Sequence, residues 1–337
     1  MTVTFIIPTW NRGDLLAAAL ASVERQQPAP HQVLVVDNGS TDGSGDIARR
    51  AGAEVLRLDR NRGFSFAVNR GVEAARGEAV ALVNNDVDLE PDWGRRLSDA
   101  LDQTTAWFAI GKLLDFARRD TVDGAGDALC RGGTAWRLGH GRADSPAFNQ
   151  PRRTFFSSAT AVMARRELFS RAGKLDEVFF TYLEDVDLGL RAALLGLDGV
   201  YVPEAVAYHR GSATLGPGSA QTVEWMTRNQ ILLLAKFYPA GLLWRFWRPI
   251  LAAQTLWGGA AILRGHPVAW ARGLASGLAG GPALRRSAAA WRANGNRLAE
   301  VLLRSEAELV SFQRSTGWDR YWRWYFCLAP CPKETQA

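Results

Sequence analysis

The sequence contains a short apolar run that ends abruptly in a cluster of amide and carboxylate side chains. Ala79 to Val83 are all apolar, and Asn84 to Asp88 follow directly. An apolar run of strand length without polar alternation predicts a strand buried on both faces, as in a parallel sheet. Because side chains alternate along an extended chain, we expect Asp86 and Asp88 to point the same way.

Two carboxylates on one side of a strand repel each other unless a cation lies between them. Carboxylate oxygens suit Mg²⁺ or Mn²⁺, which usually keep coordination positions open for phosphate oxygens. Asp86 and Asp88 are therefore candidate metal ligands. The other interpretation is a polar turn before the next helix, with Asp92 near the start of that helix.

The N-terminal part of the chain alternates between apolar runs and amphipathic helical segments. This alternation predicts βαβ units and a parallel sheet with right-handed crossovers. In such sheets, ligands bind outside the carboxyl ends of the strands. Four polar clusters are expected at that edge and together predict one binding site: Thr9–Arg12, Asp37–Ser40, Asn61–Gly63 and Asn84–Asp88.

With these motifs in place, the chain resembles the family 2 glycosyltransferases, most closely the bacterial rhamnosyltransferase and galactofuranosyltransferase type. The resemblance covers about residues 2–236 and implies a GT-A fold, an α/β domain with a Rossmann-like, mostly parallel sheet flanked by helices. Asn85 departs from the pattern, since many rhamnosyltransferase-like members have proline there. Four segments occur in the order and spacing of the family: Ile6–Asn11, Val35–Asp42, Asn61–Phe64 and Asn84–Asp88.

The resemblance also implies a role for individual residues. Asp37 would bind the base of a UDP- or dTDP-sugar, and Asp86 and Asp88 would form the D-x-D metal motif. His209, which follows the strand-like run 205–208, would be the third ligand of a Mn²⁺ or Mg²⁺ ion, although a lone histidine is more often structural. The residues implied in nucleotide-sugar binding are Pro8, Thr9, Asn11, Asp37, Asn61, Gly63, Asn85 and Asp86.

A second informative stretch begins a predicted helix at Glu184. Acidic residues in a first helical turn are favoured by the helix dipole, which is the structural interpretation of Glu184 and Asp185. Asp187 and Arg191 are four residues apart and are expected to form a supporting ion pair. Glu184-Asp185 also matches the family's E-D motif, whose second residue is the catalytic base. Asp185 is thus the candidate base, with Glu184, Asp187 and Arg191 in support.

The C-terminal part has a different composition. Met226 to Cys327 contain 14 basic and four acidic residues, a net charge of +10, and eight of the 13 tryptophans. We therefore divide the chain into a GT-A catalytic domain at 1–236 and a helical Trp/Arg-rich extension at 237–337. Mixed Trp, Leu and Arg on helices suit an anionic membrane surface. The competing interpretation is a homo-oligomerisation subdomain that buries the same tryptophans.

These features predict an inverting, metal-dependent glycosyltransferase. It would move a sugar, with rhamnose as a candidate, to a cell-surface glycan or a polyprenyl-diphosphate-linked acceptor. We expect no nucleic-acid partner. Because the N-terminus lacks signal-peptide features and the three cysteines form no disulfide framework, we expect a cytoplasmic protein at the inner face of the plasma membrane. The rival interpretations are a non-catalytic nucleotide-sugar-binding or membrane-scaffold protein and a sugar nucleotidyltransferase.

Overall fold

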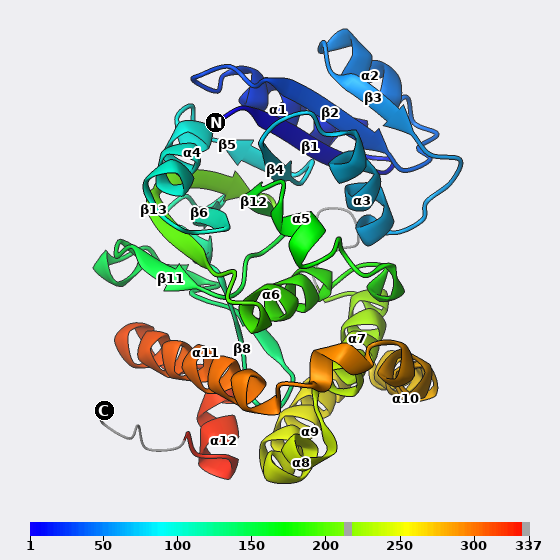
Figure 1. Ribbon diagram of the computed structural model, residues 1–337, viewed down its shortest axis with the longest axis vertical. Helices are drawn as coiled ribbons and strands as arrows, with labels where there is room; N and C mark the ends of the chain where they lie inside the picture. Colours follow the sequence, from blue (N-terminus) through cyan, green and yellow to red (C-terminus); the bar gives the residue numbers. More distant parts are fainter. Residues whose placement is uncertain (212–217, 332–337) are drawn as a thin grey trace. The chain divides into compact units, whose positions relative to one another are not determined.

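The first four strands form the parallel half of one sheet (Figure 1). The computed structural model describes residues 1–211 and 218–331. The strands stand in the order β3-β2-β1-β4, and each is separated from the next in sequence by a helix. The elements are β1 (Val3–Thr9), α1 (Gly13–Glu24), β2 (Gln32–Asp37), α2 (Ser44–Arg50), β3 (Glu54–Arg57), α3 (Phe64–Ala74) and β4 (Ala79–Val83).

The other half of the sheet mixes strand directions. Strand β12 lies antiparallel between β4 and β6, and β13 runs parallel to β6 and antiparallel to β5 and β11. The α/β class is confirmed, and the antiparallel pairs are an addition to the predicted parallel sheet. The strands are β5 (Val87–Leu89), β6 (Phe108–Asp115), β7 (Thr121–Gly124), β10 (Arg142–Ala143), β11 (Arg152–Thr154), β12 (Ala161–Arg165) and β13 (Gly199–His209).

Helical periodicity accounts for how the connecting helices pack. In α4 (Trp93–Gln103), Trp93, Leu97 and Leu101 recur every four residues and are fully buried, so this stripe covers the sheet. All five residues of β4 are buried, as an unbroken apolar run predicts. The remaining short elements of this region are η1 (Pro146–Phe148), α5 (Leu168–Arg171), η2 (Glu177–Phe179) and α6 (Glu184–Leu194).

The chain divides into two compact units. The first comprises Met1–Asp127 and Arg137–Pro217, and the second comprises Ala128–Trp136 and Gly218–Ala337. The second unit is helical, as expected for the C-terminal region. Its helices are α7 (Ala220–Phe237), α8 (Ala240–Arg245), α9 (Trp247–Leu263), α10 (Pro267–Ser287), η3 (Ala289–Arg292), α11 (Gly295–Thr316) and α12 (Arg320–Leu328).

The structural division differs from the predicted boundary after residue 236. Helix α7 groups with the helices that follow it because it packs along α10. Small residues make that close approach possible: a Cβ on Gly273 would lie 2.3 Å from the carbonyl oxygen of Glu224 in α7. Residues 212–217, near the boundary, lie outside the described residues.

A short excursion of the chain, residues 128–136, belongs to the helical unit. It is flanked by β8 (Asp127–Leu129) and β9 (Ala135–Arg137), which pair with each other. The Arg131 guanidinium forms a buried ion pair with Glu306 of α11, and Tyr325 donates a 2.6 Å hydrogen bond to the same carboxylate. The Leu129 amide donates to the Ser305 hydroxyl at 2.8 Å. Removing one partner of a buried ion pair costs about 3–5 kcal/mol, so this excursion is firmly attached to α11 and α12.

We predict that Gly111 in β6 tolerates no side chain. The register between β6 and β13 shifts between Val202 and Val206, and a Cβ on Gly111 would lie 1.9 Å from the carbonyl oxygen of Ala205 in that bulge. Gly111→Ala should lower the free energy of unfolding by at least about 1–3 kcal/mol, measured by urea denaturation.

Gly259→Ala is the matched control, because its Cβ would meet nothing within 4 Å on helix α9. Alanine is favoured over glycine inside a helix by about 0.5–1 kcal/mol, so this change should be neutral or stabilising. Equal stability of the two variants would contradict the tight approach of the bulge to Gly111.

Candidate active site

The ends of β1, β2 and β4 bring distant polar segments into contact. Because these strands are parallel neighbours, their carboxyl ends share one edge of the sheet. The Asn85 side chain donates to the Thr9 hydroxyl at 2.9 Å, and the Asn11 amide donates to the Ser40 hydroxyl at 3.0 Å. Pro8 and Thr9 are the last residues of β1 and lie beside β2. The structure therefore brings together Pro8, Thr9, Asn11 and Asn85.

Asp37 ends β2 with a fully buried side chain. Its Oδ1 accepts a hydrogen bond from the Ser40 amide at 2.8 Å, and its Oδ2 lies 3.8 Å from the Arg57 guanidinium. Within the described residues, Oδ2 accepts no hydrogen bond. A carboxylate oxygen without a donor can accept a hydrogen bond from the N–H of a nucleotide base.

The loop at Asn61–Gly63 joins the same region. Asn61 Oδ1 accepts hydrogen bonds from the Asn38 side chain at 3.1 Å and from the Gly63 amide at 2.9 Å. Gly63 has a φ of 90°, and a Cβ there would lie 2.5 Å from the Phe180 ring. Glycine is therefore required, and it lets this loop pack against the segment that leads into α6.

Asp86 and His209 lie next to each other, although 122 residues lie between them in sequence. His209 ends β13, which pairs with β5 directly after the turn that contains Asp86. His209 Nε2 is 3.4 Å from Asp86 Oδ2, and His209 Nδ1 is 2.8 Å from Asp123 Oδ2. A carboxylate on one ring nitrogen fixes the tautomer and aims the other nitrogen. Nε2 therefore faces Asp86.

Asp88 does not join this group, which corrects the expectation that Asp86 and Asp88 point the same way. Asp86 lies in a turn, so strand alternation begins only at Val87. Val87 is paired with His209 and Asp88 with Tyr208, so Asp88 is on the opposite face of this ladder from His209. Its carboxylate instead forms a 3.0 Å ion pair with Arg25 of α1.

A cluster of ionisable groups that the sequence analysis did not single out surrounds this pair. Arg137 of β9 donates to Asp123 Oδ2 at 2.7 Å, to the Ser158 hydroxyl at 2.8 Å and to the Thr160 hydroxyl at 3.1 Å. Arg137 also lies 3.9 Å from Asp127. These residues escape prediction because residues 115–153 show no extended helical or strand periodicity. The signal was present in Thr121–Asp127, where two aspartates flank a Gly-Ala-Gly turn.

Burial and opposing charges set the protonation of this cluster. Burial disfavours ionised Asp123, but Arg137, His140 and His209 outweigh it and hold the pKa of Asp123 well below its usual range. Burial likewise opposes the charged form of His209, yet hydrogen bonds to Asp123 and Asp86 raise its pKa to about 9. Burial raises the pKa of Asp127 to about 7. The cluster thus keeps a charged carboxylate, Asp123, beside His209.

Asp185 occupies the first turn of α6, where the backbone holds its carboxylate. The amides of Ala159 and Val186 donate to its two oxygens at 3.0 Å and 2.8 Å. Burial raises the pKa of Asp185, which these two hydrogen bonds and the charge of Arg137 partly oppose. A carboxylate with a raised pKa is better suited to accept a proton near neutral pH.

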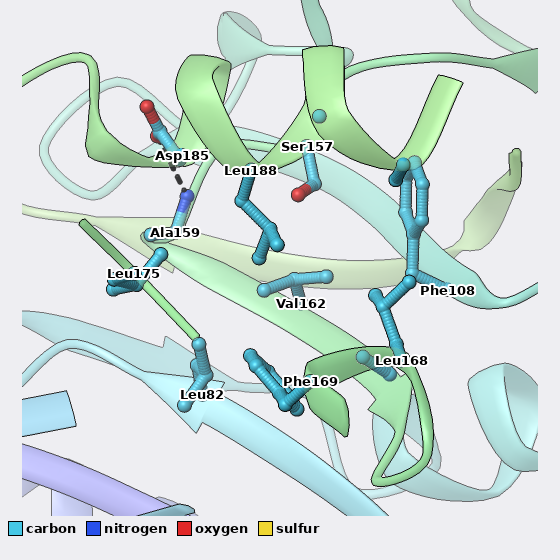
Figure 2. Close-up of a pocket in the computed structure, with 13 residues that line it drawn as sticks. Leu82, Phe108, Ser157, Ala159, Val162, Leu168, Phe169, Leu175, Asp185 and Leu188 are labelled. Carbon is cyan, nitrogen blue, oxygen red and sulfur yellow. Dashed lines mark hydrogen bonds between the residues drawn. The ribbon is translucent and has the colours of Figure 1, made fainter. Parts of the chain in front are cut away.

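An apolar pocket backs Asp185 beneath α6 (Figure 2). Leu82 of β4, Val162 of β12, Phe169 of α5 and Leu188 of α6 form much of its wall, with Asp185 at one end. Walls of this kind do not suit a charged nucleotide. We therefore assign the pocket to the apolar packing behind Asp185 and not to the donor site.

The backbone leading to Asp185 is strained. Phe180 has φ 62° and ψ −61° in a γ-turn closed by a 2.7 Å hydrogen bond from the Thr181 amide to the Phe179 carbonyl. Tyr182 and Leu183 also have positive φ. Such residues cost about 1–3 kcal/mol each and cluster at functional sites. Among non-glycine residues that the structure describes, the only other with positive φ is Asn11.

The predicted ion pair behind Asp185 is confirmed. Arg191 Nη2 lies 2.8 Å from Asp187 Oδ2, and both side chains are buried. Arg191 also donates to the Lys174 carbonyl at 2.8 Å, which ties α6 to the preceding loop. Glu184 is buried beside Asp185, and burial together with the charge of Asp185 raises the pKa of Glu184 well above its usual value.

Comparison with known proteins identifies relatives for most of the chain. A model of glycosyl transferase family 2 matches residues 4–173, and a model of glycosyl transferase family group 2 matches residues 126–285. The N-acetylglucosaminyl-diphospho-decaprenol L-rhamnosyltransferase of Mycobacterium tuberculosis is 31% identical over 256 residues, 67% of this chain and 82% of the relative. The O-antigen biosynthesis protein RfbC of Myxococcus xanthus is 31% identical over 63% of this chain, which spans only 17% of RfbC.

Solved structures share the fold. GalNAc-T7 with UDP, GalNAc and Mn²⁺ matches with a TM-score of 0.59 at 14% identity, over 77% of this chain and about half (51%) of that chain. TarS of S. aureus matches with a TM-score of 0.54 at 17% identity, over 93% of this chain and 54% of that one. The fold is GT-A-like, with a helical C-terminal region. By the family model and the rhamnosyltransferase relative, the chain belongs to glycosyltransferase family 2.

Proposed function

We propose that this family 2 glycosyltransferase is an inverting, divalent-metal-dependent enzyme. It would move a sugar, with rhamnose favoured, from a UDP- or dTDP-sugar to a polyprenyl-diphosphate-linked glycan at the inner face of the plasma membrane. The printed activity of the Mycobacterium tuberculosis relative, an L-rhamnosyltransferase that acts on a diphospho-decaprenol, supports this choice of sugar and acceptor.

One observation carries the proposal: an unbroken series of contacts joins Asp86 to Asp185. Asp86 faces His209, His209 binds Asp123, and Asp123 binds Arg137. Arg137 binds Ser158 and Thr160, and the amide of the intervening Ala159 binds Asp185. One network of contacts therefore positions both Asp86, the candidate metal ligand, and Asp185, the candidate base.

The donor set of Asp86 and His209 fits a divalent cation. Within residues 1–211 and 218–331, no group of three or more His, Cys, Asp or Glu side chains is arranged to hold a metal ion. Two protein ligands are enough for Mg²⁺ or Mn²⁺ when substrate phosphates and water complete the shell. Asp123 would orient His209, as second partners of metal-bound imidazoles do. When bound, the ion would neutralise charge on the departing diphosphate.

The remaining chemistry is assigned to Asp185. An acceptor hydroxyl attacks the anomeric carbon from the side opposite the diphosphate, its proton passes to the Asp185 carboxylate, and the bond from the carbon to the diphosphate oxygen breaks. The raised pKa of Asp185 and its apolar backing both favour proton uptake. Inversion follows from a single displacement of this kind.

We predict that Asp86, and not Asp88, is required for metal-dependent donor binding. Asp86→Ala should abolish the Mn²⁺-dependent part of nucleoside diphosphate affinity in calorimetry, because it removes one of two ligands. Asp88→Ala removes only a surface ion pair with Arg25, which is worth about 0–1 kcal/mol, and should leave that affinity near wild type. The assignment fails if the two variants behave alike.

We predict that Asp123→Asn weakens metal affinity about 10- to 100-fold, the usual cost of losing the partner that orients a metal-bound imidazole. Asn can occupy the same space, so the change removes charge and not bulk. Titration of Mn²⁺ in the presence of UDP, with no acceptor, measures this directly. Wild-type affinity would show that Asp123 does not position His209.

We predict that Asp185→Asn lowers turnover by about 10²- to 10⁴-fold, the usual cost of removing a general base. Donor affinity should stay near wild type. Asn can accept only one of the two backbone hydrogen bonds, because its amide nitrogen is a donor, so we expect at most a modest fall in melting temperature beside the large loss of turnover. Asp46→Asn is the matched control, since Asp46 lies in the first turn of α2 and is exposed. Near-normal turnover with a lowered melting temperature would leave Asp185 a helix-capping residue.

We predict that UDP or dTDP displaces bound donor better than GDP does. The Oδ2 atom of Asp37 is an acceptor that matches the N3–H of uracil or thymine, and guanine presents a different edge. A competition assay with the three nucleotides at equal concentration provides the measurement. A clear preference for GDP would remove Asp37 from this role.

A further inference from the structure

The helical unit contains a long stretch without negative charge. Residues 225–299 include nine arginines and one lysine, and no aspartate or glutamate. Surface arginines of soluble domains usually alternate with acidic residues that offset their charge. Any negative charge that offsets these ten cationic side chains therefore has to come from another part of the chain or from a binding partner.

Helices α8 and α9 bury one face and expose the other with helical periodicity. Leu242, Phe246, Pro249 and Ala253 are buried at spacings of three and four residues, which defines the inner face. The residues that alternate with them form what we call the outer face: Trp244, Arg245, Trp247, Arg248 and Leu251.

The outer face exposes more large apolar side chains than is usual for a surface in contact with water. Trp244, Trp247 and Leu251 are 79%, 53% and 59% exposed, although soluble proteins seldom gather large apolar side chains at one exposed place. Arg245 and Arg248 lie between them in sequence and are also exposed. Apolar anchors mixed with cations are typical of helices that lie in a membrane interface.

Helix α12 repeats this pattern independently. Its inner residues Trp322 and Tyr325 are buried, while Arg323, Trp324 and Leu328 are exposed. Helix α12 packs against α9, and the Tyr321 hydroxyl donates a hydrogen bond to the Ala253 carbonyl of α9 at 3.0 Å. In Figure 1, α8 and α9 are yellow and α12 is red. Among the helices of the described residues, none combines the length and the apolar character that crossing a bilayer requires.

We propose that the outer face docks on an anionic lipid bilayer. Trp244, Trp247 and Leu251 enter the headgroup region, and Arg245 and Arg248 pair with lipid phosphates. Charge complementarity selects this occupant, because an acid-free, arginine-rich surface repels a second copy of itself. The inference rests on the proposed function and deepens it, because it names the surface that would hold the enzyme near a lipid-linked acceptor.

Sedimentation of the full-length protein with vesicles tests the proposal. The vesicles contain phosphatidylcholine alone, or phosphatidylcholine and phosphatidylglycerol in equal parts. We expect binding to the anionic vesicles that weakens as salt is added, because exposed charges are screened. Arg245→Glu with Arg248→Glu should reduce partitioning by more than about tenfold, since each arginine near an anionic surface contributes about fivefold.

Two further variants separate the specific surface from general effects. Trp244→Ser with Trp247→Ser and Leu251→Ser should also lose vesicle binding while the melting temperature stays unchanged, because none of these side chains is buried. The control, Arg50→Glu with Arg95→Glu, makes the same change in net charge at exposed arginines of the first unit and should bind as wild type does. If the control lost as much vesicle binding, the loss would be due to net charge and not to the outer face, and the proposal would be overturned.

The remaining outcomes are equally decisive. If the serine variant keeps its vesicle binding but changes sedimentation velocity in the absence of lipid, the outer face joins two copies of the chain and the proposal is wrong. Vesicle binding is measured without donor or acceptor, so its result does not depend on whether the proposed sugar transfer is correct. Conversely, loss of sugar transfer in Asp185→Asn leaves vesicle binding unchanged.

Discussion

The pairing of β13 with its neighbours is the constraint on which the candidate site depends. This strand runs beside β6 along most of its length and reaches β5 only with its last residues. Its bulge fits over Gly111, where no side chain is tolerated. Because a slip of one residue would turn every side chain to the other face, this register decides that His209, and not Tyr208, faces Asp86.

The site also shows how a protein can keep several carboxylates in a small buried volume. Like charges at short range drive one another toward the protonated form. Here Arg137 stands between the acids and contacts both Asp123 and the hydroxyls beside Asp185. The carboxylate that bears the most cationic partners, Asp123, stays ionised, whereas the pKa values of Asp127 and Asp185 rise. Arg137 lowers the pKa of all three carboxyls, and burial outweighs it at Asp127 and Asp185 but not at Asp123, where His140 and His209 add to its effect.

Much of this could be predicted from the sequence where local pattern decides the structure. The apolar run before Asn84 predicts a buried strand, and the spacing of Asp187 and Arg191 predicts their ion pair. Asp88 could not be placed, because whether residue 86 lies in a strand or a turn depends on where pairing with β13 begins. Asp123 and Arg137 were missed for a related reason: each lies in a short strand with no periodicity of its own, and long-range contacts alone give them a role.

The excursion at residues 128–136 has a consequence for how this chain can be shortened or recombined. The polypeptide leaves the sheet-containing unit after Asp127, contributes Arg131 to the helical unit and returns at Arg137. Deleting everything after residue 217 would remove Glu306, the ion-pair partner of Arg131. The residues that flank the excursion, Asp127 and Arg137, both belong to the candidate site, so the deletion would also disturb that site. The helical region therefore cannot be exchanged between relatives as a continuous C-terminal segment. Residues 128–136, which lie in sequence between two parts of the sheet-containing unit, would have to be exchanged with it.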